Sequence, residues 1–361
     1  MTSKVLSPRE IPELQPSSPL WALYQPDKAP LRFAAASADE ARDWQARARE
    51  ALLDAIGFQS LPVVPAEPQT LEQVDKGDYV REKILIRTSP WTVMPVYILK
   101  PKTVPEPAPA VVAFHGHGYG VKDIVGLWED GEERDTPDGY HLDFGVALCR
   151  RGFIVAAPEI SCFGERLGDF SHLKPEIGQE IPYTCHHTAT LAFYLGGSAV
   201  GLRVWDGLRL VDYLETRGDV DMQRLGAMGI SGGGMHTFYS TAVDLRIKAC
   251  VVSGYFCTYK YSILNMHHCT CNYVPGLHRF GEIYDLAGLI APRPMLVEAG
   301  TRDPIFPIEG VKEAVDRARN VYGVFDSSDK LETDIFEGRH QIHGKRAYDF
   351  LWDCLAGPKT A

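Results

Sequence analysis

The sequence lacks most features of membrane, secreted and nucleic-acid-binding proteins. Its apolar runs are all far shorter than the roughly 20 residues that cross a bilayer. The first ten residues hold no apolar segment of the kind that a secretory signal requires, so we expect a cytoplasmic protein. The net charge of −10 disfavours nucleic acid and anionic membrane surfaces as partners, because neither attracts an acidic protein. A small molecule is the expected partner.

The cysteines lack the regular spacing of a disulfide framework. No Cys-x-x-Cys pair and no His-Glu-x-x-His sequence is present, and the chain shows neither internal repeats nor low-complexity segments. In a chain of this length we expect reduced thiols, most of them buried as small apolar groups. We predict neither a metal site nor a cofactor. The eight cysteines are Cys149, Cys162, Cys185, Cys250, Cys257, Cys269, Cys271 and Cys354.

The N-terminal part differs in composition from the rest. Residues 1–35 are rich in proline and have no hydrophobic periodicity, which predicts an arm draped over the surface. A helix should follow, because Ser37 and Glu40 form a capping box, an apolar stripe follows at helical spacing, and Gly57 ends the pattern. Residues 58–80 look like a loop. We therefore assign residues 1–80 to an arm and a helix that pack on the main domain.

The main domain, residues 81–361, is predicted to have an α/β fold. Two strands first form a hairpin, and strands then alternate with helices, which is typical of a mostly parallel sheet with helices on both faces. The predicted strands cover 82–88, 94–100, 110–115, 153–158, 224–228, 248–254, 294–300 and 332–337. The predicted helices cover 140–150, 187–217 with a break at 196–198, 232–243, 308–322 and 345–355.

Two long excursions interrupt this alternation. They cover 159–187 and 255–285, and both leave from the carboxyl ends of predicted strands. Ligands of open α/β sheets bind at that edge, and long connections tend to be functional. We expect the two excursions to form lid-like insertions over a site there.

The sequence Gly229-Ile230-Ser231-Gly232-Gly233 lies between a predicted strand and a predicted helix. Gly-x-Ser-x-Gly in that context is the nucleophile elbow, a strained turn that exposes a serine hydroxyl at the top of a sheet. The flanking glycines have a physical reason, because a Cβ there would strike the neighbouring strand or helix. Ser231 is the candidate nucleophile.

A serine nucleophile needs a base and a group that orients the base. In this arrangement the chain order is Ser, then Asp or Glu, then His. Asp303 lies just past one predicted strand and His340 just past the last, so they are the expected acid and base. Glu298 is a competing acid, although it falls within its strand. His343 is a competing base, although it lies at the start of the last helix.

An oxyanion hole needs two backbone N–H groups. Gly232, immediately after the nucleophile, supplies one of them. The turn His115-Gly116-His117-Gly118 closes an earlier strand, and the N–H of His117 is the expected second donor.

The excursions should supply the walls of the substrate pocket. The candidate wall residues are Phe163, Arg166, His186, Tyr255 and His267. The run His267-His268-Cys269-Thr270-Cys271 also suggests a metal site, with residues 185–187 from the other excursion. We favour pocket walls, because adjacent histidines point in different directions and the common zinc spacings are missing.

These stretches together resemble the α/β-hydrolase superfamily, and within it the branch of dienelactone hydrolases and acetyl xylan esterases. The resemblance implies an α/β-hydrolase fold and hydrolysis of carboxylic esters through an acyl-enzyme. One departure is that dienelactone hydrolases use a cysteine nucleophile, where this chain has a serine. The stretches that carry the resemblance are 115–118, 163–166, 229–234, 285–294 and 338–340.

The sequence therefore predicts a serine carboxylesterase that needs no cofactor. A serine peptidase of the prolyl-oligopeptidase type shares the order of the three residues, but residues 1–100 are too short for its propeller. A silent pseudo-hydrolase used for binding is the third hypothesis. Without a secretory signal, we do not expect a polymeric extracellular substrate. The arm and the hairpin are candidate contacts of a homo-oligomer.

Overall fold

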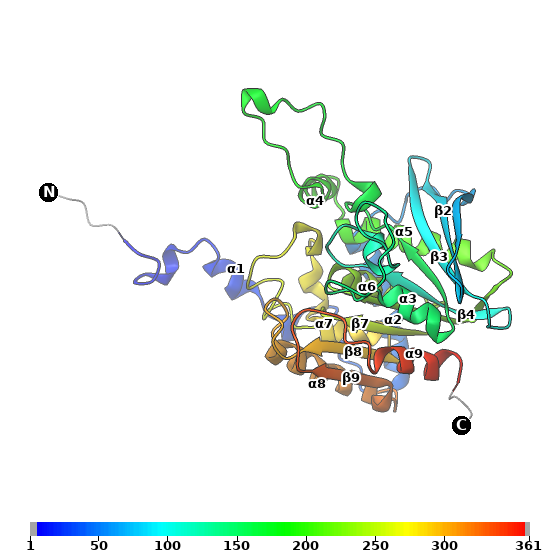
Figure 1. The fold of residues 1–361 in the computed structure, drawn as a ribbon. Helices are drawn as coiled ribbons and strands as arrows, with labels where there is room; N and C mark the ends of the chain where they lie inside the picture. The colour runs from blue at the N-terminus through cyan, green and yellow to red at the C-terminus, as the bar shows by residue number, and fades with distance from the viewer. Residues whose placement is uncertain (1–5, 358–361) are drawn as a thin grey trace.

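A computed structural model describes residues 6–357 of the chain. These residues form a nine-stranded sheet in the order β1-β2-β3-β5-β4-β6-β7-β8-β9 (Figure 1). The strands are β1 (Gln69–Asp75), β2 (Tyr79–Ser89), β3 (Thr92–Pro101), β4 (Ala108–Phe114), β5 (Ile154–Pro158), β6 (Val220–Ile230), β7 (Ala249–Ser253), β8 (Met295–Gly300) and β9 (Leu331–Phe336).

The sheet has an antiparallel part and a parallel part. Strands β1, β2 and β3 pair antiparallel, and β3 joins β5 antiparallel as well. All pairs from β5 through β9 are parallel. The central strands β4, β5 and β7 are buried along their whole length, as expected for parallel strands covered on both faces. The predicted α/β-hydrolase architecture is confirmed.

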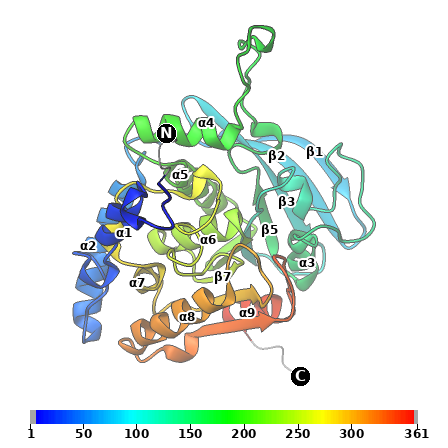
Figure 2. The ribbon, with the colours of Figure 1, turned by 90° about the vertical axis from the view of Figure 1, so that its left-hand side faces the viewer.

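Helices cover both faces of the sheet (Figure 2). Helices α3 and α9 pack on one face, and α2, α5, α6 and α8 pack on the other, which holds the larger core. The α-helices are α1 (Ser18–Leu23), α2 (Ala38–Ile56), α3 (Phe144–Arg151), α4 (Thr184–Tyr194), α5 (Ala199–Glu215), α6 (Gly232–Val243), α7 (Ile283–Leu286), α8 (Ile308–Gly323) and α9 (Ala347–Leu355).

Helix α2 forms for the reasons that its sequence indicates. The Ser37 hydroxyl accepts a hydrogen bond from the N–H of Glu40, and Gly57 ends the helix with φ +82°. The buried apolar side chains of α2 pack against α5, α6 and residues 285–291. The predicted break between α4 and α5 is also present, since Ser198 caps α5 by accepting from the N–H of Gly201.

Three predictions of local structure were wrong. Residues 69–75, expected to be loop, form the edge strand β1; six of its seven residues are exposed, so it has no apolar alternation to reveal it. The helix expected over 140–150 begins only at Phe144, because Leu142 and Asp143 adopt positive φ. Residues 6–23 of the arm, including α1, extend away from the body and are mostly exposed (Figure 1), whereas residues 24–35 do lie on the body.

Both excursions carry short helical turns and little other regular structure. Part of the first excursion, residues 168–183, extends outward as a loop that we call the projecting loop (Figures 1 and 2). Its ends meet, because the N–H of Gly168 donates to the hydroxyl of Thr184 at 3.1 Å.

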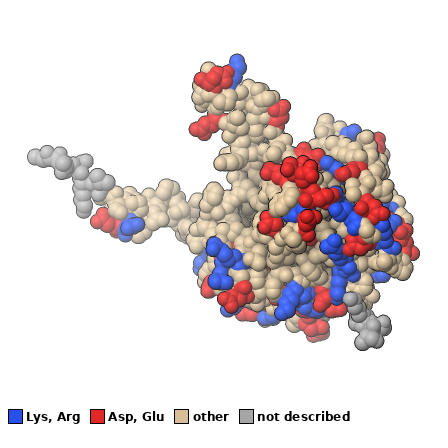
Figure 3. Space-filling model, in the orientation of Figure 1, with Lys and Arg blue, Asp and Glu red and all other residues tan. Residues whose placement is uncertain are grey.

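Charged side chains of both signs are interspersed over the face of the body that Figure 3 shows. Among the described residues, no helix is both long enough and apolar enough to cross a membrane.

Candidate active site

Ser231 lies in a strained turn between β6 and α6. Its φ of +59° and ψ of −121° fall outside the common regions for a residue with a side chain. Its N–H donates to the carbonyl of Ser253 at 3.0 Å, which fixes the turn to the neighbouring strand. A Cβ at Gly233 would lie 1.9 Å from the carbonyl oxygen of Phe114, and one at Gly229 would lie 2.4 Å from that of Gly233. Both positions therefore require glycine.

The structure brings Asp303 and His340 together at the same edge of the sheet. Nδ1 of His340 lies 2.6 Å from one carboxylate oxygen of Asp303. The other oxygen accepts hydrogen bonds from the N–H groups of Ile305 at 2.9 Å and Phe306 at 3.0 Å. A carboxylate only accepts, so Nδ1 carries the proton and Nε2 has a free lone pair. That Nε2 atom is buried and has no hydrogen-bond partner among the described residues.

The His340 ring lies over the end of the strand next to the one that carries Ser231. A Cβ at Gly254, the residue that follows β7, would lie 3.0 Å from the imidazole Cε1. The ring stacks on Phe306, with centroids 5.7 Å apart, and lies 5.4 Å from the ring of Tyr140. Packing against these two rings fixes the orientation of the imidazole.

The two competing residues make other contacts. Glu298 accepts from the hydroxyl of Ser253 at 2.8 Å and from the N–H groups of His343 at 3.0 Å and Gly344 at 2.8 Å. The His343 ring pairs instead with Asp334, at 2.9 Å. Glu298 therefore anchors the loop that carries His340, and His343 belongs to a separate pair at its edge.

A hydrogen-bonded histidine holds each side of the turn after β4. The ring of His115 accepts from the N–H of Ile160 at 3.0 Å, which ties the turn to the segment after β5. On the other side, Nε2 of His141 accepts from the N–H of Gly116 at 2.8 Å, while Nδ1 contacts Asp123 at 2.7 Å. Burial lowers the pKa of His141 below its usual value, although the Asp123 carboxylate opposes the change. A neutral ring fits its role as an acceptor.

Tyr140 and His117 complete the surroundings of Ser231. The Tyr140 hydroxyl donates to the carbonyl of His117 at 2.6 Å. A Cβ at Gly116 would lie 2.2 Å from that hydroxyl and 3.1 Å from Cβ of Ser231, so this glycine allows the tyrosine to approach the serine. The His117 ring lies over Gly232, where a Cβ would be 3.0 Å from Nδ1. The N–H of His117 has no hydrogen-bond partner within residues 6–357, and the N–H of Gly232 belongs to the first turn of α6, which has no intrahelical partner.

A cleft of about 500 Å³ opens beside His117. Three of the predicted wall residues, Phe163, His186 and His267, line it. Its lining residues are His117, Gly118, Cys162, Phe163, Leu167, Tyr183, Thr184, Cys185, His186, His267, His268, Cys269 and Thr270.

The other two predicted wall residues lie elsewhere. Arg166 pairs with Asp206 at 2.7 Å and donates to the carbonyl of Glu159, so it fixes its own loop. Tyr255 is 2% exposed and packs against Phe306, and neither residue lines the cleft. Both were misplaced because a side chain in a loop can point into the core as easily as into a cleft.

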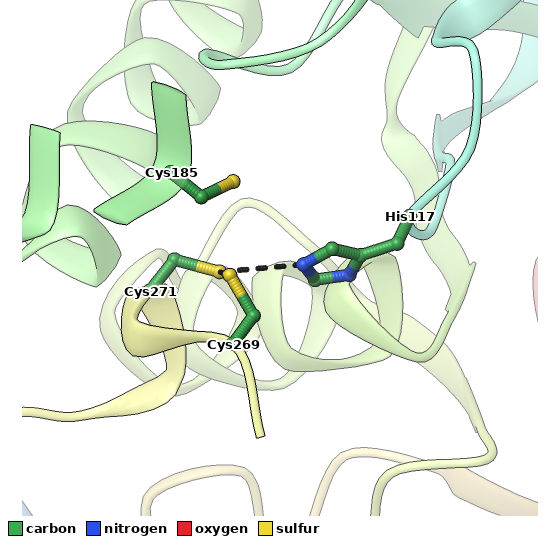
Figure 4. Close-up of side chains that lie close together, drawn as sticks. All are labelled: His117, Cys185, Cys269 and Cys271. Carbon is green, nitrogen blue, oxygen red and sulfur yellow. Dashed lines mark hydrogen bonds between the residues drawn. The ribbon is translucent and has the colours of Figure 1, made fainter. Parts of the chain in front are cut away.

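Three residues of the cleft wall, His117, Cys185 and Cys269, form a cluster with Cys271 (Figure 4). One ligand atom from each of His117, Cys185, Cys269 and Cys271 lies within 4.8 Å of the other three. Arg203, on α5, is buried behind them and donates to the sulfurs of Cys271 at 3.2 Å and Cys185 at 3.6 Å. The ligand types suit a soft metal ion.

Tyr140, His141 and Arg203 were not predicted as residues of the site. Tyr140 and His141 fell at the start of an expected helix, and nothing in that local pattern indicated a role in the site. Arg203 falls within a correctly expected helix, and its burial could not be seen from sequence. The Cys-x-Cys spacing of residues 269 and 271, considered together with residues 185–187, was the sequence signal for the cluster, but His117 comes from a third segment and was expected in another role.

The strand order, the serine elbow after β6, and the Asp303–His340 pair at the carboxyl edge place the protein in the α/β-hydrolase class. The chain belongs to the Abhydrolase family, whose model matches residues 24–324. This match confirms the membership that the sequence motifs predicted.

Known proteins resemble the chain in sequence and in structure. "Putative hydrolase YtaP" of Bacillus subtilis (strain 168) is 29% identical over 266 residues, which cover 72% of this chain and 81% of YtaP. Among solved structures, a "putative acetyl xylan esterase" of Bacteroides fragilis NCTC 9343 has a TM-score of 0.73 at 17% identity, over 90% of this chain and 82% of that one. The glucuronoyl esterase of Solibacter usitatus has a TM-score of 0.61 at 18% identity, over 86% and 92%. At these identities the solved structures show a shared fold.

Proposed function

We propose that the protein is a serine hydrolase of small carboxylic esters that acts through an acyl-enzyme. The observation that carries this proposal is the free, buried Nε2 of His340, held by Asp303 at the sheet edge where Ser231 lies in its strained turn. A strained serine and an oriented base are the parts that nucleophilic acyl transfer needs.

In the first half of the reaction, Oγ of Ser231 attacks the carbonyl carbon of the ester and His340 takes the hydroxyl proton. The negative charge that forms on the carbonyl oxygen is stabilised by the N–H groups of Gly232 and His117. His340 then returns the proton to the leaving alcohol as the ester C–O bond breaks. In the second half, water attacks the acyl carbon while His340 takes its proton, and His340 returns this proton to Oγ of Ser231 as the bond between Oγ and the acyl carbon breaks and the acid is released.

The cleft beside His117 supports a small substrate. Its volume of about 500 Å³ lies in the usual range for small-molecule sites. The solved structures of similar fold include esterases named for acetyl xylan and for glucuronoyl substrates. We therefore propose small esters, including those of acylated sugars, as the first substrate class to test.

The test is hydrolysis of a panel of p-nitrophenyl esters graded by acyl length, together with acetylated sugars. Ser231→Ala should abolish turnover while the circular dichroism spectrum and the Tm stay unchanged. Labelling by a fluorophosphonate probe should occur in the wild type and be lost in the variant. Undiminished turnover in Ser231→Ala would refute the mechanism, and a wild type that neither turns over esters nor reacts with the probe would indicate a silent pseudo-hydrolase.

A further inference from the structure

The cluster beside the cleft has the composition of a closed metal site. We infer that His117, Cys185, Cys269 and Cys271 bind one zinc ion, which joins the turn after β4 to both excursions. Three thiolates and an imidazole are a ligand set of structural zinc, in which four protein ligands complete the tetrahedron.

The distances fit such a tetrahedron. With zinc–sulfur bonds of about 2.3 Å, neighbouring sulfurs of a tetrahedral site lie about 3.8 Å apart, and a sulfur and an imidazole nitrogen about 3.6 Å apart. The sulfurs of Cys269 and Cys271 are separated by 3.2 Å, and Nε2 of His117 lies 3.6 Å from Cys271 Sγ. All four ligand atoms lie within 4.8 Å of one another, so small side-chain rotations close the site.

Arg203 gives independent evidence that the cluster carries negative charge. Its side chain is fully buried, and no carboxylate of the described residues forms an ion pair with it. Its partners are the sulfurs of Cys271 and Cys185 and the carbonyl oxygen of Ser161. A buried guanidinium requires a compensating charge nearby. Zinc with three thiolates has a net charge of −1, and Arg203 neutralises it.

The four ligands come from three separate segments of the chain, which a zinc ion would hold together. Cys269 and Cys271 lie at the short turn η6 (Thr270–Asn272) in the second excursion, and Cys185 lies in the first turn of α4. His117 belongs to the turn after β4. The turn after β4 and the second excursion have little regular structure of their own, and four metal bonds would join them to α4 and fix one wall of the cleft and the position of the His117 backbone.

The ring of His117 binds the ion through Nε2, so its backbone N–H stays free to face Ser231. The metal's role is therefore to position this N–H, and only that consequence rests on the proposed function. Binding converts three thiols to thiolates and releases their protons to solvent.

The first test is elemental analysis of protein purified from zinc-supplemented cells, in buffers free of added metal and chelator. We expect about one zinc per chain. A mercurial reagent should release this zinc as the cysteines react, as detected with a colorimetric zinc indicator. The double variant Cys269→Ser/Cys271→Ser should lose the zinc. Cys257→Ser is the matched control, because Cys257 is a buried cysteine of the same excursion outside the cluster, and it should retain the zinc.

A second test needs no variant and so survives a failure of the double variant to fold. Wild-type protein reconstituted with Co²⁺ should show the sulfur-to-cobalt charge-transfer band in the near ultraviolet and the intense visible bands of a tetrahedral site. Several results would overturn the inference: no zinc and no such spectrum, iron in place of zinc, an unchanged zinc content in the double variant, or a Cys269–Cys271 disulfide in protein purified without oxygen.

Zinc content and ester turnover separate a failure of the zinc site from a failure of the proposed hydrolase function. Ser231→Ala should keep its full zinc content while it loses ester turnover. A chain that hydrolyses esters without zinc would leave the hydrolase proposal intact, and a chain that binds zinc without reacting with esters would leave the zinc site intact.

Discussion

Replacing Asp303 by asparagine tests the central pair of the site with little disturbance of the fold. The amide oxygen can still accept from the N–H groups of Ile305 and Phe306, as the carboxylate oxygen does. The amide NH₂ group then faces Nδ1 of His340, where a carboxylate oxygen now lies at 2.6 Å. Two donors cannot face each other, so the ring must adopt the tautomer with the proton on Nε2. That tautomer cannot accept the proton of Ser231.

We expect kcat to fall by about 10⁴-fold, equal to about 5.4 kcal/mol of activation free energy. The free energy of unfolding should change by no more than about 1 kcal/mol, because both backbone hydrogen bonds remain. The assay is hydrolysis of a short-chain p-nitrophenyl ester under saturating substrate. Urea denaturation of the same preparation reports the stability.

Asp334→Asn provides a matched control. Asp334 makes the same kind of contact, to Nδ1 of His343 at 2.9 Å, in the neighbouring pair that we exclude from the mechanism. Its kcat should match that of the wild type. The reasoning is refuted if Asp303→Asn retains kcat within tenfold of the wild type, or if the two variants lose activity equally.

Three further predictions concern the same edge of the sheet. His340→Gln should lower kcat by about 10⁶-fold, whereas His343→Gln should leave it unchanged; equal losses would show that the wrong histidine is the base. Burial lowers the folded-state pKa of His141, so the unfolded chain binds more protons below about pH 6.5, and the free energy of unfolding should fall as the pH drops below that value. Urea titrations between pH 5 and pH 8 measure this slope, which His141→Gln should flatten; a slope that persists in the variant would assign it to other groups. Arg203→Met should weaken zinc binding by about 10–100-fold in competition with a chromophoric chelator, and unchanged affinity would show that the guanidinium does not support the thiolates.

Local motifs made the candidate catalytic residues predictable from sequence. Ser231 directly follows β6, and Asp303 and His340 lie three and four residues past the ends of β8 and β9; parallel strands bring these carboxyl ends to one edge. The order of the three residues along the chain is then enough to propose their roles. No knowledge of side-chain packing is needed.

The rest of the site depends on contacts between distant segments. His117 lies more than 60 residues before Cys185 and more than 150 before Cys271, and no local pattern connects them. Tyr140 approaches Ser231 only because residues 140–143 leave the expected helix, with Asp143 at a φ of +48°. The strand β1 escaped prediction for another reason: it is held by backbone hydrogen bonds at the sheet edge and buries almost no apolar side chain.

The closed base of the projecting loop makes its tip separable from the rest of the chain. The hydrogen bond from Gly168 to Thr184 brings the two ends together, so a short Gly/Ser linker could replace residues 171–181 and leave Cys185 and α4 in place. The same geometry makes the tip a natural insertion point for a second protein domain, whose ends would emerge side by side. A cut by a protease at this tip would give two fragments that stay joined through the sheet.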